Sequence, residues 1–550
     1  MYPHRSTLLT LWSLLFTTLT APLQAQTQCV EQLNFRPVTQ LNRIEWQKFP
    51  EFKLPFTIIY DGPRLGEAPF SPLKRGFSHI ASITLDEQAS SPGSIRAKGF
   101  YGVAFGLNQP WETIESPWNN DMDAYRAKWD RWLNEFSGGQ RDAQGRYKLP
   151  AGFFMLDIER MHETDERILR IKNNPLVPEQ YRRLPDAEFI RQYKKDMTAL
   201  YAESMRFVRE KADMTNIPLT TYADVPIRNT WLNVVGNSWQ DWSTNPDRVS
   251  YLVKDPATNR IGGPFYEQMD VIAPSIYYYN DYPSPLAGDY LAYMLFQIDA
   301  NRAWSNKPII PFAWMRYHDC CGSFPKFIQP HMAEATAIFP FFAGAKGLWL
   351  WEHGNFRTND APMAAYEYFI HGLYRLSQVA DMFEGDYQLV IDKPARDHMD
   401  EQSPVWRGVY KDKKLLIAAQ NPYAAEGQST TLTVRFQSWS KDITLKGKEV
   451  YLCKFDLGAE GFEADALSGL TIFPNPSAAR TAVEFYAESP RTVQLQLFTL
   501  TGQAVLSQSL EAVKGRNLTE LQTIPLPAGS YIVQITDGQI RLSKRLLIGR

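Results

Sequence analysis

The stretch Phe153-Phe-Met-Leu-Asp-Ile-Glu159 predicts a buried β-strand that ends in two carboxylates. An apolar run of this length is typical of a strand that is covered on both faces, as in a parallel sheet. Because side chains two apart on a strand point to the same side, Asp157 and Glu159 should share one face, about 6–7 Å apart. Two carboxylates this close disfavour double ionisation, which raises the pKa of one of them. The pair therefore offers a protonated acid near neutral pH.

Seven more apolar runs alternate with helical patterns between about residues 50 and 376. The expected strands are Phe56–Tyr60, His79–Leu85, Phe100–Leu107, Leu219–Ala223, Val271–Tyr279, Ile309–Met315 and Gly347–Trp351. The helical stretches, with apolar residues at three- and four-residue spacing, include Ala124–Phe136, Ala187–Lys211, Leu286–Trp304, His331–Phe341 and Ala361–Leu376. Eight strands that alternate with helices predict the α/β class and a (β/α)8 TIM barrel over residues 26–380.

In such a barrel the active site lies at the carboxyl ends of the strands. Aromatic and charged residues gather at four of these ends besides the one with Asp157 and Glu159. They are Tyr222, Asp224, Tyr277, Tyr279, Trp314, Arg316, Trp349, Trp351 and Glu352. Flat aromatic side chains stack on sugar rings, so this set predicts a sugar-binding floor around the two carboxylates. The alternative for the carboxylates is a structural ion pair with Arg160 or another arginine.

The position of both carboxylates on one strand separates two mechanisms of glycosidic bond cleavage. Most glycosidases place their two carboxylates on opposite sides of the scissile bond. Here the nucleophile would be Glu352 or Asp224, acting on a non-acetylated glycan, or the acetamido oxygen of the substrate itself. In the acetamido mechanism Glu159 is the acid/base and Asp157 stabilises the acetamido nitrogen. A surface glycan-binding protein without catalysis is a third interpretation.

Three segments carry a family resemblance: Leu156-Asp-Ile-Glu159, Ala273-Pro-Ser-Ile-Tyr277 and Gly344-Ala-Lys-Gly-Leu-Trp-Leu-Trp351. Together they resemble the hyaluronidase family and, more distantly, the chitinases and other hexosaminidases. The resemblance implies a glycoside hydrolase that cleaves a polysaccharide containing N-acetylhexosamine by substrate-assisted acid/base catalysis. It also implies roles for four residues: Glu159 as proton donor, Asp157 as its partner, Tyr277 as acetamido ligand and Trp351 beneath the sugar.

Two further domains are expected after the barrel. Residues 381–466 contain alternating runs such as Val405–Tyr410 separated by turn residues, which predicts a small β-sandwich. Residues 467–550 contain further short β runs that predict a second sandwich. With Phe473-Pro-Asn-Pro476, Leu500-Thr-Gly-Gln503 and the basic-apolar end Lys544–Ile548, this last segment resembles the C-terminal sorting domain of the type IX secretion system of Bacteroidetes. The resemblance implies the type IX machinery as a partner and a secreted or outer-surface location in a Gram-negative, Bacteroidetes-like bacterium.

The start of the chain predicts an export signal over residues 1–25, with an apolar run from Leu8 to Leu19 and small residues at Ala21 and Ala25. No later stretch is long and apolar enough to cross a bilayer, so we expect no transmembrane segment in the mature chain. A net charge of -2 argues against a nucleic-acid partner, whereas 13% aromatic residues suit a polysaccharide substrate.

The histidines and cysteines do not have the spacing of a metal site. His162, His318 and His353 lie near strand ends and are expected to make polar contacts with a substrate. The four cysteines, Cys29, Cys320, Cys321 and Cys453, allow one or two disulfides in an oxidising compartment. No glycine-rich phosphate loop follows a strand, so no cofactor is expected.

Overall fold

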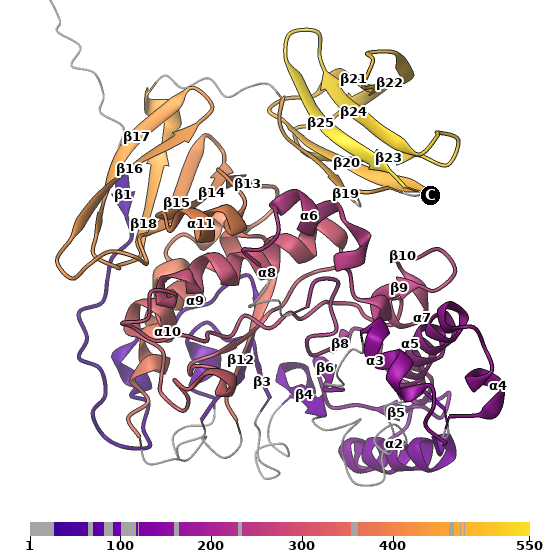
Figure 1. Cartoon of the computed structure of the whole chain (residues 1–550). Helices are drawn as coiled ribbons and strands as arrows, with labels where there is room; N and C mark the ends of the chain where they lie inside the picture. Colours follow the sequence, from indigo (N-terminus) through magenta and orange to yellow (C-terminus); the bar gives the residue numbers. More distant parts are fainter. Residues whose placement is uncertain are drawn as a thin grey trace, which may run out of the picture.

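The computed structural model describes most of the chain. The described residues are 27–63, 70–81, 92–100, 117–118, 120–158, 164–175, 177–228, 234–353, 361–460, 467–473, 475–477 and 479–549. The predicted signal peptide, residues 1–25, and the predicted proton donor Glu159 lie outside them, as do residues 82–85 and 101–107 of two expected strands. The described chain is a mixed α/β protein whose C-terminal part consists of β-sheets (Figure 1).

Four parallel strands form one sheet in the N-terminal part. Their order is β11 (Phe312–Trp314), β12 (Gly347–Trp351), β2 (Thr57–Asp61) and β3 (His79–Ile80). The register places Trp349 between Phe312 and Ile59. Nearly every residue of these strands is buried, as expected for parallel strands that are covered on both faces.

Three more parallel strands form a second sheet in the order β4 (Ala97–Phe100), β6 (Phe153–Leu156) and β8 (Leu219–Thr221). Single parallel bridges connect this sheet to the first one. They join Ile80 to Arg96, Tyr222 to Ala273, Ile272 to Ile309 and Ser275 to Phe312. The expected strand over residues 271–279 is thus present only as a bridged segment, because Pro274 has no N–H to donate to a ladder. In the described chain the continuous ladders form two sheets rather than the single eight-stranded ring expected from the sequence.

Helices pack against these sheets. The long ones are α2 (Met122–Ser137), α5 (Asp186–Lys211), α8 (Tyr290–Trp304), α9 (Pro330–Phe342) and α10 (Ala364–Ser377). The short ones are α3 (Asp165–Ile171), α4 (Glu179–Arg182), α6 (Trp239–Thr244), α7 (Gly263–Tyr266) and α11 (Ala395–Glu401). No helix of the described chain is both long and apolar enough to span a membrane.

An antiparallel sheet follows the last of the long helices. Its order is β1 (Thr27–Cys29), β18 (Tyr451–Asp456), β15 (Lys414–Gln420), β14 (Val405–Lys411) and β13 (Gln388–Ile391), with a separate hairpin of β16 (Ser429–Phe436) and β17 (Trp439–Lys446) packed on it. Strand β1 lies in the stretch that we expected to belong to the barrel. It instead completes this sheet, where Cys29 pairs with Cys453.

This antiparallel sheet lies next to α8 and α9 (Figure 1), and buried polar contacts attach it to the α/β part. Arg407 of β14 donates to Asp299 of α8 at 2.7 Å, and both side chains are almost completely buried. Tyr423 donates to Asp289 at 2.7 Å in the segment that leads into α8. A buried ion pair is costly to break because it leaves one charge without compensation, so these contacts hold the two parts in a fixed relation.

The C-terminal residues form two facing antiparallel sheets. One has the order β19 (Leu467–Phe473), β20 (Arg480–Ala487) and β23 (Gly515–Gln522). The other has the order β22 (Ala504–Ala512), β21 (Arg491–Thr499), β24 (Gly529–Thr536) and β25 (Arg541–Ile548). Alternate residues such as Val483, Leu495 and Val533 point into a shared core, as in a β-sandwich.

Removal of the disulfide between Cys29 and Cys453 is expected to destabilise the protein by about 2–5 kcal/mol. The bond closes a loop of 424 residues, so its loss increases the conformational freedom of the unfolded chain. The double substitution Cys29→Ser, Cys453→Ser should therefore lower the free energy of unfolding measured in urea. Equal stability of the variant and the wild type would show that the disulfide contributes nothing to the stability of the fold.

Candidate active site

Four aromatic side chains meet at the carboxyl ends of the parallel strands. Tyr277 is central: its ring stacks on Trp351 and Tyr222, with centroids 6.0 and 6.2 Å away, and meets Trp314 edge-on at 5.5 Å. Trp314 and Trp351 also touch, at 4.9 Å. Tyr277 and Trp314 are buried by these neighbours, whereas Tyr222 and Trp351 are partly exposed. The structure thus brings four predicted site residues together and leaves two of the rings accessible from solvent.

Strand alternation explains why these rings meet. Phe312 and Trp314 on β11, and Trp349 and Trp351 on β12, belong to one inner hydrophobic cluster. Residues two apart on a strand face the same side, so each pair points inward at successive depths. Trp349 stacks on Phe312 at 4.9 Å, has no exposed surface and donates to Asp61. Trp349 therefore lies one layer below the rings at the strand ends, and its role as a sugar contact stays a prediction.

Asp157 follows β6 directly and continues its inner face. Leu156 pairs with Thr221, and the N–H of Tyr222 donates to the carbonyl of Leu156 at 3.1 Å, which places Asp157 beside Tyr222. Asp157 is 8% exposed. A carboxylate with so little contact with water interacts strongly with a polar group brought beside it. The position of Glu159 relative to Asp157 stays a prediction, because Glu159 lies outside the described residues.

The chain turns sharply after Tyr222. Ala223 has a φ of 58°, and its N–H donates to the carbonyl of Ala273 at 3.0 Å. A residue other than glycine in this left-handed region costs about 1–2 kcal/mol, and such strain is common at functional sites. The next residue, Asp224, is only 1% exposed, so this predicted site carboxylate has little surface to offer a substrate.

Glu352 is the centre of a buried hydrogen-bond network. Its Oε1 accepts from Nε1 of Trp314 at 2.7 Å and from the N–H of His353 at 2.9 Å. Its Oε2 accepts from Nε of Arg316 at 2.9 Å and from the hydroxyl of Tyr366 at 3.0 Å. Burial raises the pKa of Tyr366 well above its usual value, which keeps this hydroxyl protonated as a donor. Glu352 thus has no exposed surface and accepts from four donors, one of which is Trp314 of the ring cluster.

Two other predicted contacts are also held by protein groups. Arg316 is buried, and besides Glu352 it donates to the carbonyl of Pro325 at 2.6 Å. Tyr279 packs edge-on against Tyr293, with ring centroids 5.7 Å apart. Its ring also lies tilted against that of His318, with centroids 5.3 Å apart. Arg316 is therefore held by Glu352 and Pro325. Tyr279 contacts His318, whose ring in turn contacts Tyr277 of the aromatic cluster.

Two residues at the strand ends were not predicted as site residues. Asp61 ends β2, is 2% exposed and accepts from Nε1 of Trp349 at 3.3 Å. It follows an apolar run directly, which is the same signal that identified Asp157. Phe324 reaches Trp314 from a loop, with ring centroids 5.8 Å apart. No periodic pattern marks a single loop residue, so the sequence offered no signal for Phe324.

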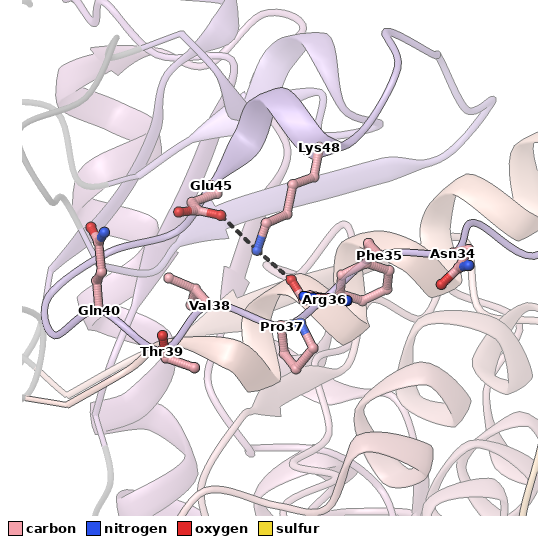
Figure 2. A pocket seen from close by; sticks show the side chains of 9 residues that line it. All are labelled: Asn34, Phe35, Arg36, Pro37, Val38, Thr39, Gln40, Glu45 and Lys48. Atoms are coloured by element: carbon pink, nitrogen blue, oxygen red, sulfur yellow. Dashed lines mark hydrogen bonds and ion pairs between the residues drawn. The ribbon is translucent and has the colours of Figure 1, made fainter.

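A cavity of about 370 Å³ lies away from the strand ends, along residues 34–40 (Figure 2). Nζ of Lys48 borders it and donates to the carbonyl of Arg36 at 2.6 Å, while pairing with Glu45 at 2.7 Å and with the buried Glu367 at 3.0 Å. Lys48 therefore holds the N-terminal segment in place through these three interactions.

The described residues contain no group of three or more His, Cys, Asp or Glu arranged to hold a metal ion.

The C-terminal sheets correspond to a known family. Residues 471–549 match the model of the secretion system C-terminal sorting domain. The expected sorting domain is thereby confirmed, and it indicates secretion by the type IX route to the cell surface or the extracellular space. No curated protein matches the chain.

Solved structures similar to the chain include several glycoside hydrolases. Bee venom hyaluronidase has a TM-score of 0.40 and 13% identity, over 58% of this chain and 99% of its own. A glucosidase from Croceicoccus marinus has a TM-score of 0.31 and 10% identity, over 92% and 97%. An endo-β-1,4-mannanase from Thermotoga petrophila has a TM-score of 0.25 and 10% identity, over 77% and 70%.

Proposed function

We propose that this protein is a secreted glycoside hydrolase that cleaves a polysaccharide containing N-acetylhexosamine. The observation that carries the proposal is the ring cluster around Tyr277 beside the shielded carboxylate of Asp157. Aromatic faces bind the apolar faces of sugar rings, and a carboxylate next to them can act on the substituents of the bound sugar.

The proposal includes a (β/α)8 barrel as the scaffold. The scaffold is supported by the single bridges that link β3 to β4, β8 to the segment around Ala273, and that segment to β11. One inner hydrophobic cluster takes buried members from six of the eight strand segments, including Ile59, Ala97, Met155 and Ala273. Ala81, after β3, and Tyr222, after β8, are partly buried and pack against it. A core shared by eight parallel segments is the arrangement of a barrel interior, with its active site at the carboxyl ends.

The proposed mechanism uses the acetamido group of the substrate as nucleophile. Glu159 protonates the leaving oxygen, and Asp157 orients the acetamido nitrogen and stabilises the positive charge that develops on it. The hydroxyl of Tyr277 donates a hydrogen bond to the acetamido carbonyl as it attacks the anomeric carbon. Burial and existing contacts of Glu352, together with the low exposure of Asp224, disfavour these carboxylates as an enzymatic nucleophile.

A pair of substrates tests this function. The purified protein should release oligosaccharides from an N-acetylated polymer such as hyaluronan or chitosan of high acetyl content, and should not cleave the same polymer after de-N-acetylation. Tyr277→Phe should slow cleavage by about 5–150-fold, as expected for the loss of one buried hydrogen bond of about 1–3 kcal/mol. Equal cleavage of acetylated and deacetylated polymer would contradict substrate assistance.

Deletion of residues 467–550 is expected to abolish secretion while leaving activity unchanged. The cut removes β19 whole, and the C-terminal sheets have their own hydrophobic core. Hydrogen bonds cross the boundary from Ser468 to Gln388 at 3.1 Å, from Tyr486 to the carbonyl of Tyr387, and from Arg260 to the carbonyl of Gly549 at 3.1 Å. None of them involves a residue of the ring cluster. The measurement compares the amounts of full-length and truncated protein in the medium and in the cells. It also compares kcat/KM of the two purified proteins. A truncated chain that is folded but inactive would place part of the active site in the removed residues.

A further inference from the structure

His318 stands at the rim of the aromatic cluster, in the segment that follows β11. Its N–H donates to the carbonyl of Tyr278 at 2.7 Å, and the preceding Tyr317 forms a parallel bridge with Tyr278. This pairing extends the register between the two strand ends. As a result the imidazole lies against the rings of Tyr279 and Tyr277, with centroids 5.3 and 6.0 Å away.

The loop that carries His318 is folded back on β11 and well held. Arg316 bridges Phe327 in antiparallel register, and the N–H of Ile328 donates to the carbonyl of Met315 at 3.0 Å. Near the tip, Cys320 is disulfide-bonded. The side chain of His318 is 29% exposed, so a ligand can reach it from solvent.

The contacts of the imidazole determine which nitrogen carries the proton. Nδ1 accepts a hydrogen bond from the N–H of Cys320 at 3.2 Å. Because a backbone N–H can only donate, an Nδ1 that accepts it is unprotonated and the proton resides on Nε2. Asp319 also lies 3.0 Å from Nδ1, but its side chain is 67% exposed, so solvent screens its charge. Burial lowers the pKa of His318, which favours the neutral ring. Within the described chain no residue hydrogen-bonds Nε2.

We propose that His318 is a specificity-determining residue, whose Nε2–H donates a hydrogen bond to an oxygen of the N-acetylhexosamine that binds against Tyr277. This inference rests on the proposed function for the class of sugar. The imidazole packs against Tyr277, is partly exposed to solvent and presents Nε2–H as a hydrogen-bond donor. A buried or partly buried donor discriminates strongly against ligands that leave it unpaired.

Two substitutions separate hydrogen bonding from packing. His318→Gln keeps an N–H donor close to the position of Nε2, whereas His318→Phe keeps an aromatic ring and removes the donor. The probes are the tetrasaccharides of N-acetylglucosamine and of hyaluronan, titrated by calorimetry and by tryptophan fluorescence. We expect His318→Phe to bind the preferred tetrasaccharide about tenfold more weakly than the wild type and His318→Gln to bind within about threefold.

Asp319→Asn is the matched control. It removes the neighbouring carboxylate and leaves the N–H of Cys320 in place, so affinity should stay unchanged. An affinity loss equal to that of His318→Phe would mean that His318 acts as an imidazolium paired with Asp319, and would overturn the assignment. Equal affinity of wild type and His318→Phe, or no binding of either tetrasaccharide by the wild type, would also overturn it. Binding that follows the expected pattern without any hydrolysis would refute the proposed catalysis and leave the role of His318 intact.

Discussion

Glu159→Gln should lower kcat by roughly 10²–10⁴-fold while the affinity for substrate stays nearly the same. Glutamine keeps the shape of the side chain but has no proton that it can transfer to the leaving oxygen. Hydrolysis of the acetylated polymer under saturating conditions measures kcat, and calorimetric titration with its tetrasaccharide measures affinity.

The control for this substitution is Glu166→Gln, on the first turn of α3. The carboxylate of Glu166 is 83% exposed and, among the described residues, pairs with the exposed Arg170 at 3.2 Å. Its removal should leave kcat within about twofold of the wild-type value, since such surface pairs are worth at most about 1 kcal/mol to stability. Near-normal turnover of Glu159→Gln would exclude Glu159 as the acid.

Glu352→Gln is expected to cost about 3–5 kcal/mol of folding stability, because it leaves the buried charge of Arg316 without its partner. In the wild type, donors such as Nε1 of Trp314 meet a carboxylate oxygen of Glu352. In the variant one of these oxygens becomes an NH₂ group, which cannot accept a hydrogen bond. Denaturant unfolding of the variant measures this cost.

An exposed pair provides the comparison for Glu352. Glu51 and Lys74 lie 2.8 Å apart with more than half of each side chain exposed, so Glu51→Gln should change stability by less than about 1 kcal/mol. If Glu352→Gln were as stable as the wild type and had lost all turnover, Glu352 would be a catalytic carboxylate and not a positioning residue.

Local patterns in the sequence predict the elements well where one segment decides its own structure. The helix expected over residues 124–136 is observed over Met122–Ser137, and its ends are explained by neighbouring residues. Asp121 caps the first turn by accepting from the N–H of Ala124, and Gly138 adopts the left-handed conformation after the last turn. The same local logic predicted the strand before Asp157.

Contacts between distant segments could not be predicted in this way. Strand β1 is three residues long, and only its pairing with β18, 424 residues away at the disulfide, makes it a strand. The strand end Trp349-Leu-Trp-Glu352 suggests three site residues, Trp349, Trp351 and Glu352, yet their depths differ. Trp349 is covered by Phe312, and Glu352 is covered in part by Tyr366 from α10, neither of which is visible in the local pattern.

The measurement that tests the central claim most directly is the affinity of a thiazoline mimic of the oxazolinium intermediate. A site built for acetamido attack binds the charge and shape of that intermediate more tightly than the sugar itself. We predict that the wild type binds the N-acetylhexosamine-derived thiazoline at least about 100-fold more tightly than free N-acetylhexosamine, and that Asp157→Asn loses most of this preference. A wild-type protein that binds the thiazoline no more tightly than the free sugar would contradict substrate-assisted catalysis at this site.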